Sequence, residues 1–326
     1  FISCSNPQKQ SNSDGVISNK KQFFSSKKKI DIIRFTEYLA QSTEQKIKES
    51  LIEKGLREGT DFEIRSRSAQ GDITNLTMLI DAAVSEKSDL IITFHSESLY
   101  VAVRRSPNLP VLFMLTSNPF ILGAGNSDTE HLPNISGIYY TPSTDILLDL
   151  IKECNSKIRR IGTLFNIGNT ESAAQKDFLV YAADRKNMKV ISEGFSTQAE
   201  IADASASLSE KKIDCIIHIY DSFSEITLPS LLKLSQTKKI PIFGFSHSSK
   251  NSNNYVISVS RERLEQEKEF ADMIIKVLQG TPPSNLPFLN NEFFKTEIFV
   301  NQKTAGDIEF KIPQNILEKS VFKINN

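Results

Sequence analysis

The sequence contains no tryptophan, only three cysteines and only four histidines among its 326 residues. The histidines, His95, His131, His218 and His247, are scattered, and no two of them share the His-x-x-x-His spacing that is typical of zinc sites. We therefore expect no bound metal, and no motif indicates a cofactor. His218 falls within a predicted strand, and we interpret it as a structural residue of that strand.

Several motifs that mark enzymes are also missing. Gly123-Ala124-Gly125 lacks the Gly-Lys-Ser/Thr that completes a phosphate-binding loop, and no Gly-x-Ser-x-Gly nucleophile elbow occurs. Acidic residues are abundant, but no pair of them is identified as an acid–base couple. We therefore expect a protein that is not an enzyme. An enzyme on the same kind of α/β scaffold is the alternative that fold class alone leaves open.

The charged residues balance, with 39 Lys plus Arg and 39 Asp plus Glu. A chain without net charge projects no strong electrostatic field, which argues against nucleic acid as a partner. No apolar run approaches the ~20 residues that a membrane helix needs. The chain is longer than one hydrophobic core supports, so we expect two domains of roughly 150 residues each.

The first 28 residues are rich in Ser, Asn, Gln and Lys, a composition that predicts a flexible tether. Cys4 follows two apolar residues and a small one, which is typical of the end of a bacterial lipoprotein signal. We therefore predict that Cys4 is acylated and anchors the protein on the extracytoplasmic side of a bacterial envelope, periplasmic or at the cell surface. The alternatives are an ordinary surface cysteine and a tether that is an expression artefact.

Strand-like and helix-like patterns alternate from Lys29 onward, which implies parallel strands joined by helical crossovers. The first series of predicted elements lies at 30–35, 41–54, 61–67, 76–85, 90–94, 98–105 and 111–115. The second series lies at 145–154, 160–165, 170–186, 189–194, 199–210, 214–219, 226–237 and 241–245. Cys154 and Cys215 fall within such elements, and we interpret both as buried thiols without a disulfide.

We therefore predict an α/β protein with two doubly wound open-sheet lobes and a ligand cleft between them. The first lobe comprises 29–142 plus 255–285, and the second comprises 143–254 plus 286–326. Ligands of such sheets bind beyond the carboxyl ends of strands, often at helix N-termini. The segments expected around the cleft are 94–98, 116–119, 166–172, 220–224 and 246–249.

The charged and hydroxyl candidates lie in two of these segments. Ser96 and Ser98 begin a predicted helix, where hydroxyls and free backbone N–H groups can bind a carboxylate or simply cap the helix. We expect Glu97 to face solvent and to complement the helix dipole, because a cleft-facing Glu97 would repel an anionic ligand. Asp221 follows a buried strand and can pair with a ligand ammonium or cap the next helix.

Further candidates are polar residues at strand ends and aromatic residues that either stack on an apolar ligand group or belong to the core. The polar candidates are Ser117, Asn118, Asn166 and Ser222. The aromatic candidates are Phe94, Phe165, Tyr220, Phe223 and Phe245.

Several segments match one known family in order and spacing. They are Ser68-Ala69-Gln70-Gly71-Asp72, Leu109-Pro110-Val111-Leu112-Phe113, Asn118-Pro119, Arg160-Ile161-Gly162-Thr163-Leu164-Phe165-Asn166, Lys239-Ile240-Pro241-Ile242-Phe243 and Asn301-x-x-x-Ala305. Through them, residues 29–313 resemble the ABC transporter substrate-binding family, whose better-known members serve aromatic amino acids. This resemblance implies a type I periplasmic-binding-protein fold, a small-molecule ligand such as an amino acid, and a membrane permease as partner.

Three positions depart from the family pattern. Ser96-Glu97 stands where the family often has Thr-Pro, Asp221 is kept but its neighbours differ from Thr-Asp-Asn, and Ser246 replaces an acidic residue. Because these positions follow strands at the expected cleft, the usual ligand does not transfer directly to this chain.

We therefore predict the solute-binding component of an ABC importer, a monomer that captures an amino acid or similar molecule by lobe closure. The first alternative is a ligand-sensing receptor domain of the same fold, which would regulate a receptor instead of supplying a permease.

Overall fold

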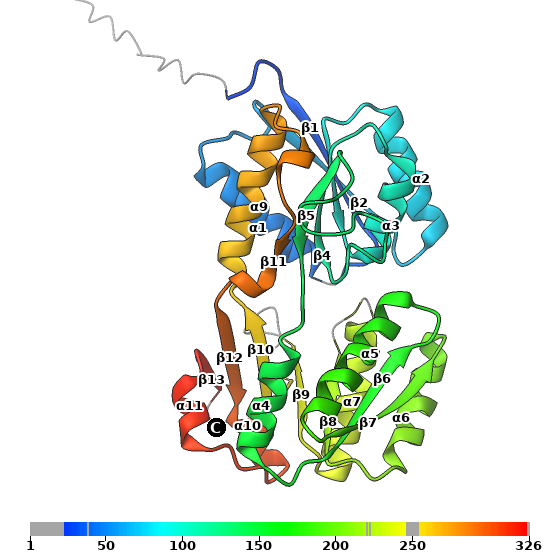
Figure 1. Ribbon diagram of the computed structural model, residues 1–326, viewed down its shortest axis with the longest axis vertical. Helices are drawn as coiled ribbons and strands as arrows, with labels where there is room; N and C mark the ends of the chain where they lie inside the picture. The colour runs from blue at the N-terminus through cyan, green and yellow to red at the C-terminus, as the bar shows by residue number, and fades with distance from the viewer. Residues whose placement is uncertain (1–22, 38, 220, 222, 246–253, 325–326) are drawn as a thin grey trace, which may run out of the picture.

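The computed structural model describes residues 23–37, 39–219, 221, 223–245 and 254–324. Within this part, the chain forms two α/β lobes stacked along the long axis of the molecule (Figure 1). The predicted α/β class with two doubly wound lobes is confirmed. No helix in the described part is both long enough and apolar enough to cross a membrane.

The first lobe is built on a parallel sheet with the strand order β11-β5-β4-β3-β1-β2. Its strands are β1 (Lys28–Arg34), β2 (Phe62–Ser68), β3 (Leu90–Phe94), β4 (Val111–Thr116), β5 (Ile135–Tyr139) and β11 (Leu289–Asn290). Its helices are α1 (Ala40–Glu53), α2 (Ile73–Ser85), α3 (Ser96–Arg105) and α9 (Arg263–Leu278), with a 3-10 turn at Pro283–Asn285. Helices α1 and α9 pack on one face of the sheet and α2 and α3 on the other, so each face has its own apolar core.

The second lobe has a sheet with the strand order β13-β12-β10-β9-β8-β6-β7, in which only the β10–β12 pair is antiparallel among the described residues. Its strands are β6 (Arg160–Asn166), β7 (Lys189–Phe195), β8 (Cys215–His218), β9 (Ile242–Phe245), β10 (Ile257–Arg261), β12 (Thr296–Asn301) and β13 (Phe322–Ile324). Its helices are α4 (Thr144–Cys154), α5 (Thr170–Arg185), α6 (Ile201–Ser209), α7 (Ser224–Lys238), α10 (Gln302–Asp307) and α11 (Gln314–Lys319), with 3-10 turns at Gln198–Glu200 and Asn291–Phe293. Two apolar clusters again cover the two faces.

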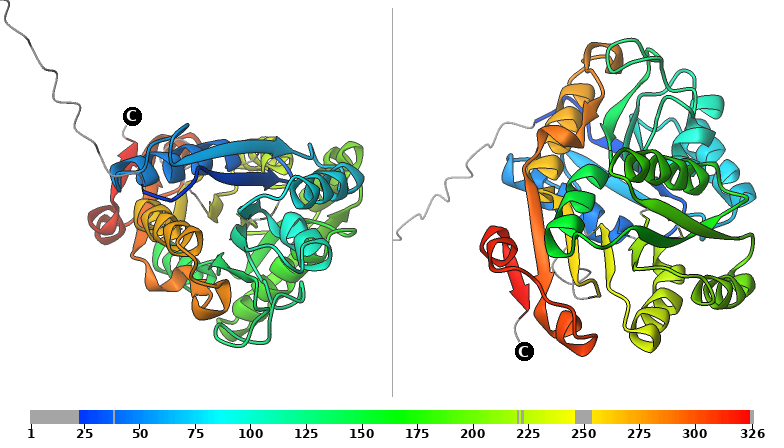
Figure 2. Two further views of the ribbon diagram at one scale, coloured as in Figure 1. Left: turned by 90° about the horizontal axis from the view of Figure 1, so that it is seen from above. Right: turned by 60° about the horizontal axis from the view of Figure 1, so that its bottom comes forward.

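The described chain passes between the lobes three times: after β5, after β10 and after β11. In Figure 1 and the right-hand view of Figure 2, β10 and β12 run along the side of the molecule that carries these connections. Three connections at one side are compatible with hinge motion of one lobe against the other.

The lobe boundaries differ from the prediction at two places. Segment 255–285 was assigned to the first lobe, but its strand β10 pairs with β9 and β12 in the second sheet. Its side chains Ile257 and Val259 are buried in the second-lobe core. Residues 286–290 were assigned to the second lobe, but Leu286 packs in the first-lobe core and β11 pairs with β5.

The two described cysteines are free thiols, as predicted. Cys215 is buried in β8, whereas Cys154 at the end of α4 is only half-buried. Burial raises the pKa of the Cys154 thiol to about 12, so this thiol is a poor nucleophile at neutral pH. Neither cysteine contributes a disulfide or a reactive thiolate to the fold.

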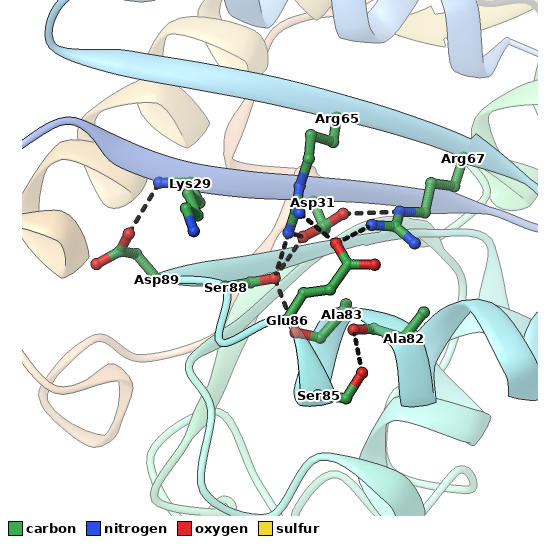
Figure 3. A network of polar contacts seen from close by, with 10 residues as sticks. All are labelled: Lys29, Asp31, Arg65, Arg67, Ala82, Ala83, Ser85, Glu86, Ser88 and Asp89. Carbon is green, nitrogen blue, oxygen red and sulfur yellow. Dashed lines mark hydrogen bonds and ion pairs between the residues drawn. The ribbon is translucent and has the colours of Figure 1, made fainter.

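A polar network joins β1, β2 and the segment after α2 in the first lobe (Figure 3). Its centre is the fully buried Asp31, which forms ion pairs with Arg65 and Arg67, the latter at 2.9 Å. Ser88 also donates to Asp31, and Glu86 accepts from Arg67 at 2.7 Å. The buried negative charge is thus compensated by two guanidinium groups, as a stable interior requires.

Candidate ligand-binding site

A pocket of about 470 Å³ lies between the two lobes. From the first lobe it is lined by Phe35, Ile73, Ser96, Glu97, Tyr100 and Leu122. From the second lobe it is lined by Asn166, Gly168, Asn169, Thr170, Glu171, Ser196 and Phe223. Because neither lobe forms this pocket alone, its shape depends on how the lobes are held together.

The pocket lies where the sequence predicts it, at the carboxyl ends of strands in both sheets. Ser96 begins α3 directly after β3, and Asn166 is the last residue of β6. Asn169 caps α5 by accepting a hydrogen bond from the Ser172 backbone N–H at 2.8 Å, and Phe223 immediately precedes α7. The N-termini of three helices therefore approach the pocket, as expected for doubly wound sheets.

Two buried carboxyl groups of the second lobe lie at the pocket. Glu171 is 6% exposed and Asp221 is 5% exposed. Burial, followed by the negative charge of Glu97, raises the pKa of Glu171 to about 8, although the nearby Ser117 and Ser96 hydroxyls favour its charged form. Burial also raises the pKa of Asp221 to about 6, again with a contribution from Glu97. Such displaced pKa values in a cleft are characteristic of functional sites.

The Asp221 carboxylate is held by three groups of its own lobe. It accepts hydrogen bonds from the Ser172 hydroxyl at 2.5 Å, the Phe223 backbone N–H at 2.9 Å and the Ser224 hydroxyl at 3.3 Å. Asp221 does not itself line the pocket, whereas Glu171 and Phe223 do. The local role considered from the sequence is therefore present just before α7, and the pairing of Asp221 with a ligand ammonium stays a prediction.

Glu97 faces the cleft, so the prediction that it faces solvent is wrong. Its side chain lines the pocket and accepts a hydrogen bond from the Asn169 side-chain amide at 2.9 Å. The physical reason is that Asn169 comes from the opposite lobe, and the first turn of α3 is directed at that lobe and away from bulk water. This hydrogen bond links the two lobes across the pocket.

The three predicted serines have different surroundings. Ser96 lines the pocket and is 4% exposed; it lies beside Glu171 and influences that pKa, but no hydrogen bond of ordinary geometry reaches its hydroxyl. Ser98 is fully buried and does not line the pocket. Ser117 is half-buried beside Glu171. Ser96 thus brings a buried hydroxyl to the pocket beside Glu171.

The side chains of the two predicted asparagines bond to the backbone: Asn118 within its own loop, and Asn166 both within its own loop and, through its amide nitrogen, to the Ser196 carbonyl oxygen at 3.5 Å. Asn118 accepts hydrogen bonds from the backbone N–H groups of Phe120 and Ile121 and does not line the pocket. Asn166 lines the pocket, but its amide oxygen accepts from the Gly168 N–H at 2.9 Å. Both residues shape the loops around the site.

Among the described residues, Phe223 is the one aromatic candidate from the sequence that lines the pocket. Phe94 and Phe245 are buried in the cores, because their strands are covered on both faces. Phe35 and Tyr100 line the pocket instead. Phe35 directly follows β1, so the strand-end rule that selected the other cleft segments could have selected it too. Nothing in the local sequence distinguishes Tyr100 on α3 as a pocket residue.

Several predictions concern residues outside the described part of the chain. These are Cys4, Tyr220, Ser222 and the segment 246–249. The ligand contacts assigned to all the site residues stay predictions.

The described residues contain no cluster of His, Cys, Asp and Glu suited to hold a metal ion. His218 is a buried strand residue, as interpreted from the sequence. Its ring nitrogens contact the Tyr255 hydroxyl at 2.7 Å and the Thr227 hydroxyl at 3.0 Å, and burial lowers its pKa to about 4. His218 is therefore neutral at physiological pH and serves the second-lobe core.

Comparisons with known proteins identify the family to which this architecture belongs. The profile of the ABC transporter substrate binding protein family matches residues 29–323. A tyrosine-binding protein of Clostridioides difficile is 26% identical over 295 residues, covering 90% of this chain and 84% of that protein.

Two solved structures are also similar. A protein of Streptococcus pneumoniae in complex with L-Trp has a TM-score of 0.83 at 20% identity, over 92% of this chain and 100% of that one. A ligand-free, open substrate-binding protein with adhesive properties from Clostridium difficile has a TM-score of 0.70 at 24% identity, over 91% and 100%. These likenesses confirm the type I periplasmic-binding-protein fold. The chain belongs to the ABC transporter substrate-binding protein family.

Proposed function

We propose that this chain is the extracytoplasmic solute-binding component of an ABC importer. It captures a small molecule that combines an ammonium group with an apolar body, as amino acids do, and delivers it to a membrane permease. The observation that carries this proposal is the pocket between the lobes, which combines buried carboxyl groups with an apolar wall from both lobes. The tyrosine-binding relative and the L-Trp-bound neighbour support the choice of ligand.

Ligand capture follows from lobe closure in this proposal. A ligand that contacts Ser96 on one lobe and Glu171 on the other has a higher affinity for the closed arrangement than for the open one. The Glu97–Asn169 hydrogen bond supports the same arrangement. In this proposal the pocket binds the ligand without chemical reaction, so the ligand is released unchanged.

Import is tested by uptake. We expect a thermal-shift panel of the twenty amino acids and their decarboxylated amines to identify at least one stabilising compound. Cells lacking the gene should lose uptake of that compound in labelled form, and the wild-type gene should restore it. Thr170→Trp, which places an indole at the exposed, pocket-lining Thr170, should not restore uptake, whereas Thr237→Trp at an exposed position outside this pocket should. Normal uptake without the gene would contradict the importer role and favour a sensor.

Anchoring is a separate part of the proposal. We propose that Cys4 is acylated, which would hold a monomeric protein at the envelope while the permease receives the ligand. The full-length protein should partition into detergent, and Cys4→Ser should remain in the aqueous phase. Equal partitioning of the two proteins would refute acylation.

A further inference from the structure

Glu171 and Asp221 are buried carboxyl groups whose described partners carry no positive charge. Hydroxyls and one backbone N–H group supply their hydrogen bonds and favourable contacts. No ion pair among the described residues includes either of them. Burial without a compensating cation disfavours the ionised form of a carboxyl group, so a bound cation would stabilise that form.

Two buried carboxylates of the first lobe have cationic partners. Asp31, which is fully buried, is paired with Arg65 and Arg67 (Figure 3). Asp61, which is 1% exposed, is paired with Arg57 at 3.0 Å. Glu171 and Asp221 are therefore distinguished from these two by the type of partner, and of the four carboxyl groups only Glu171 lines the pocket.

A second feature of the same pocket also indicates a ligand. The Ser96 hydroxyl is buried, lines the pocket and lacks a hydrogen bond of ordinary geometry. A buried hydroxyl in this state costs free energy that a ligand donor or acceptor would recover. Ser96 comes from the first lobe and Glu171 from the second, so a ligand between them would be held from both sides.

The remaining wall is apolar. Ile73, Tyr100 and Leu122 from the first lobe and Phe223 from the second line the pocket. Ile73 is 48% exposed and Tyr100 is 43% exposed, which indicates apolar surface available to a ligand. Arg104 lies behind Tyr100, 3.6 Å from the ring centroid, and does not line the pocket. The described lining residues thus include no Lys, Arg or His side chain.

A ligand carboxylate would meet an acidic side chain at each of the three helix ends that approach the pocket. Helix N-termini favour negative charge, but α3 already carries Glu97 in its first turn and α5 carries Glu171. Asp221 accepts a hydrogen bond at the start of α7. The chain itself supplies the acids that these helix ends favour.

We propose that the ligand is an amine cation with an apolar, ring-sized body and without a carboxylate beside its ammonium group. This inference rests on the proposed function and specifies its ligand class. The ammonium group is recognised by Glu171, with Asp221 behind it, and the ring contacts Tyr100 and Phe223.

Matched pairs of compounds test this directly. Isothermal titration calorimetry at pH 7.5 compares tyramine with tyrosine, tryptamine with tryptophan, and phenethylamine with phenylalanine. We expect wild-type protein to bind the amine of at least one pair at least tenfold more tightly than its amino acid. Glu171→Gln should reduce this preference at least tenfold, because it removes the carboxyl group that can ionise beside a bound ammonium group and that disfavours a ligand carboxylate.

Glu225→Gln is the matched control, because Glu225 lies in the first turn of α7 but is exposed and outside the pocket. Its amine preference should equal that of wild type. Tighter binding of the amino acids by wild type, or an unchanged preference in Glu171→Gln, would overturn the inference and leave the proposed solute-binding function intact. Failure of all six compounds to bind would overturn both the inference and the proposed amino-acid-like ligand.

Discussion

Replacing Glu171 by glutamine should make the ligand-free protein more stable at pH 8. Burial and the charge of Glu97 raise the pKa of Glu171 from 4.5 to about 8. The folded state therefore holds this proton more tightly than the unfolded state. The resulting stabilisation is complete below about pH 4.5 and is lost as the pH rises through about 8.

The size of the effect follows from the same two pKa values. They correspond to a ceiling of about 5 kcal/mol in the free energy of unfolding between low and high pH. Because the first turn of α5 favours negative charge, we expect about 2–4 kcal/mol. Glutamine has nearly the same shape and stays neutral, so Glu171→Gln should lose much less stability between pH 5 and pH 8 than wild type does.

Urea unfolding of ligand-stripped protein, followed by circular dichroism at several pH values, measures this difference. Some pH dependence should remain in Glu171→Gln, because the pKa of Asp221 is also raised, to about 6. Glu225→Gln, at the exposed first turn of α7, should follow the wild-type curve. Parallel curves for wild type and Glu171→Gln from pH 5 to pH 8.5 would refute the reasoning.

Three further predictions follow from individual contacts. Asn169→Ala removes both the α5 cap and the hydrogen bond to Glu97, so the protein should lose ~1 kcal/mol of stability and small-angle scattering should show a larger radius of gyration. Asp72→Ala removes the α2 cap alone, so it should lose a similar ~1 kcal/mol without that expansion. Asp221→Asn keeps an acceptor for the Phe223 N–H but removes the charge, so tyramine binding measured by calorimetry should weaken at least tenfold, and unchanged binding would exclude a role for this charge. Gly137→Ala places a Cβ 2.3 Å from the Phe113 carbonyl oxygen and should lower the stability of the protein by about 1–3 kcal/mol. Gly306→Ala adds a Cβ in open space on helix α10 and should raise the stability slightly. Equal melting temperatures of the two variants would contradict the packing described.

The order of strands and helices could be predicted because each is encoded locally. Buried strands such as β3 read as short apolar runs, and the helices between them have apolar residues at helical spacing. Strand β5 was not predicted as a separate element, because Ser136 and Gly137 interrupt its apolar sequence pattern. The lobe to which β10 belongs depends on its pairing with β9 and β12, and no local pattern encodes that choice.

The position of the candidate site could be predicted from the sequence, but the set of residues that line it could not. Strand ends in doubly wound sheets converge, which correctly directed attention to Ser96 and Asn166. The direction of Glu97 depends on Asn169, which comes from the other lobe, and so required the three-dimensional arrangement. Phe94 was chosen as a ligand contact although it is core, because sequence does not show which strand residues are covered by helices.

The central claim is that the pocket between the lobes binds one small molecule. Native mass spectrometry of protein purified gently from its producing cells tests this most directly. We predict a protein ion with one bound small molecule, which is released on activation and whose mass fits a compound with a basic nitrogen. The same adduct should be absent from Thr170→Trp. A bare polypeptide mass that stays unchanged after incubation with a small-molecule extract of those cells would contradict the account.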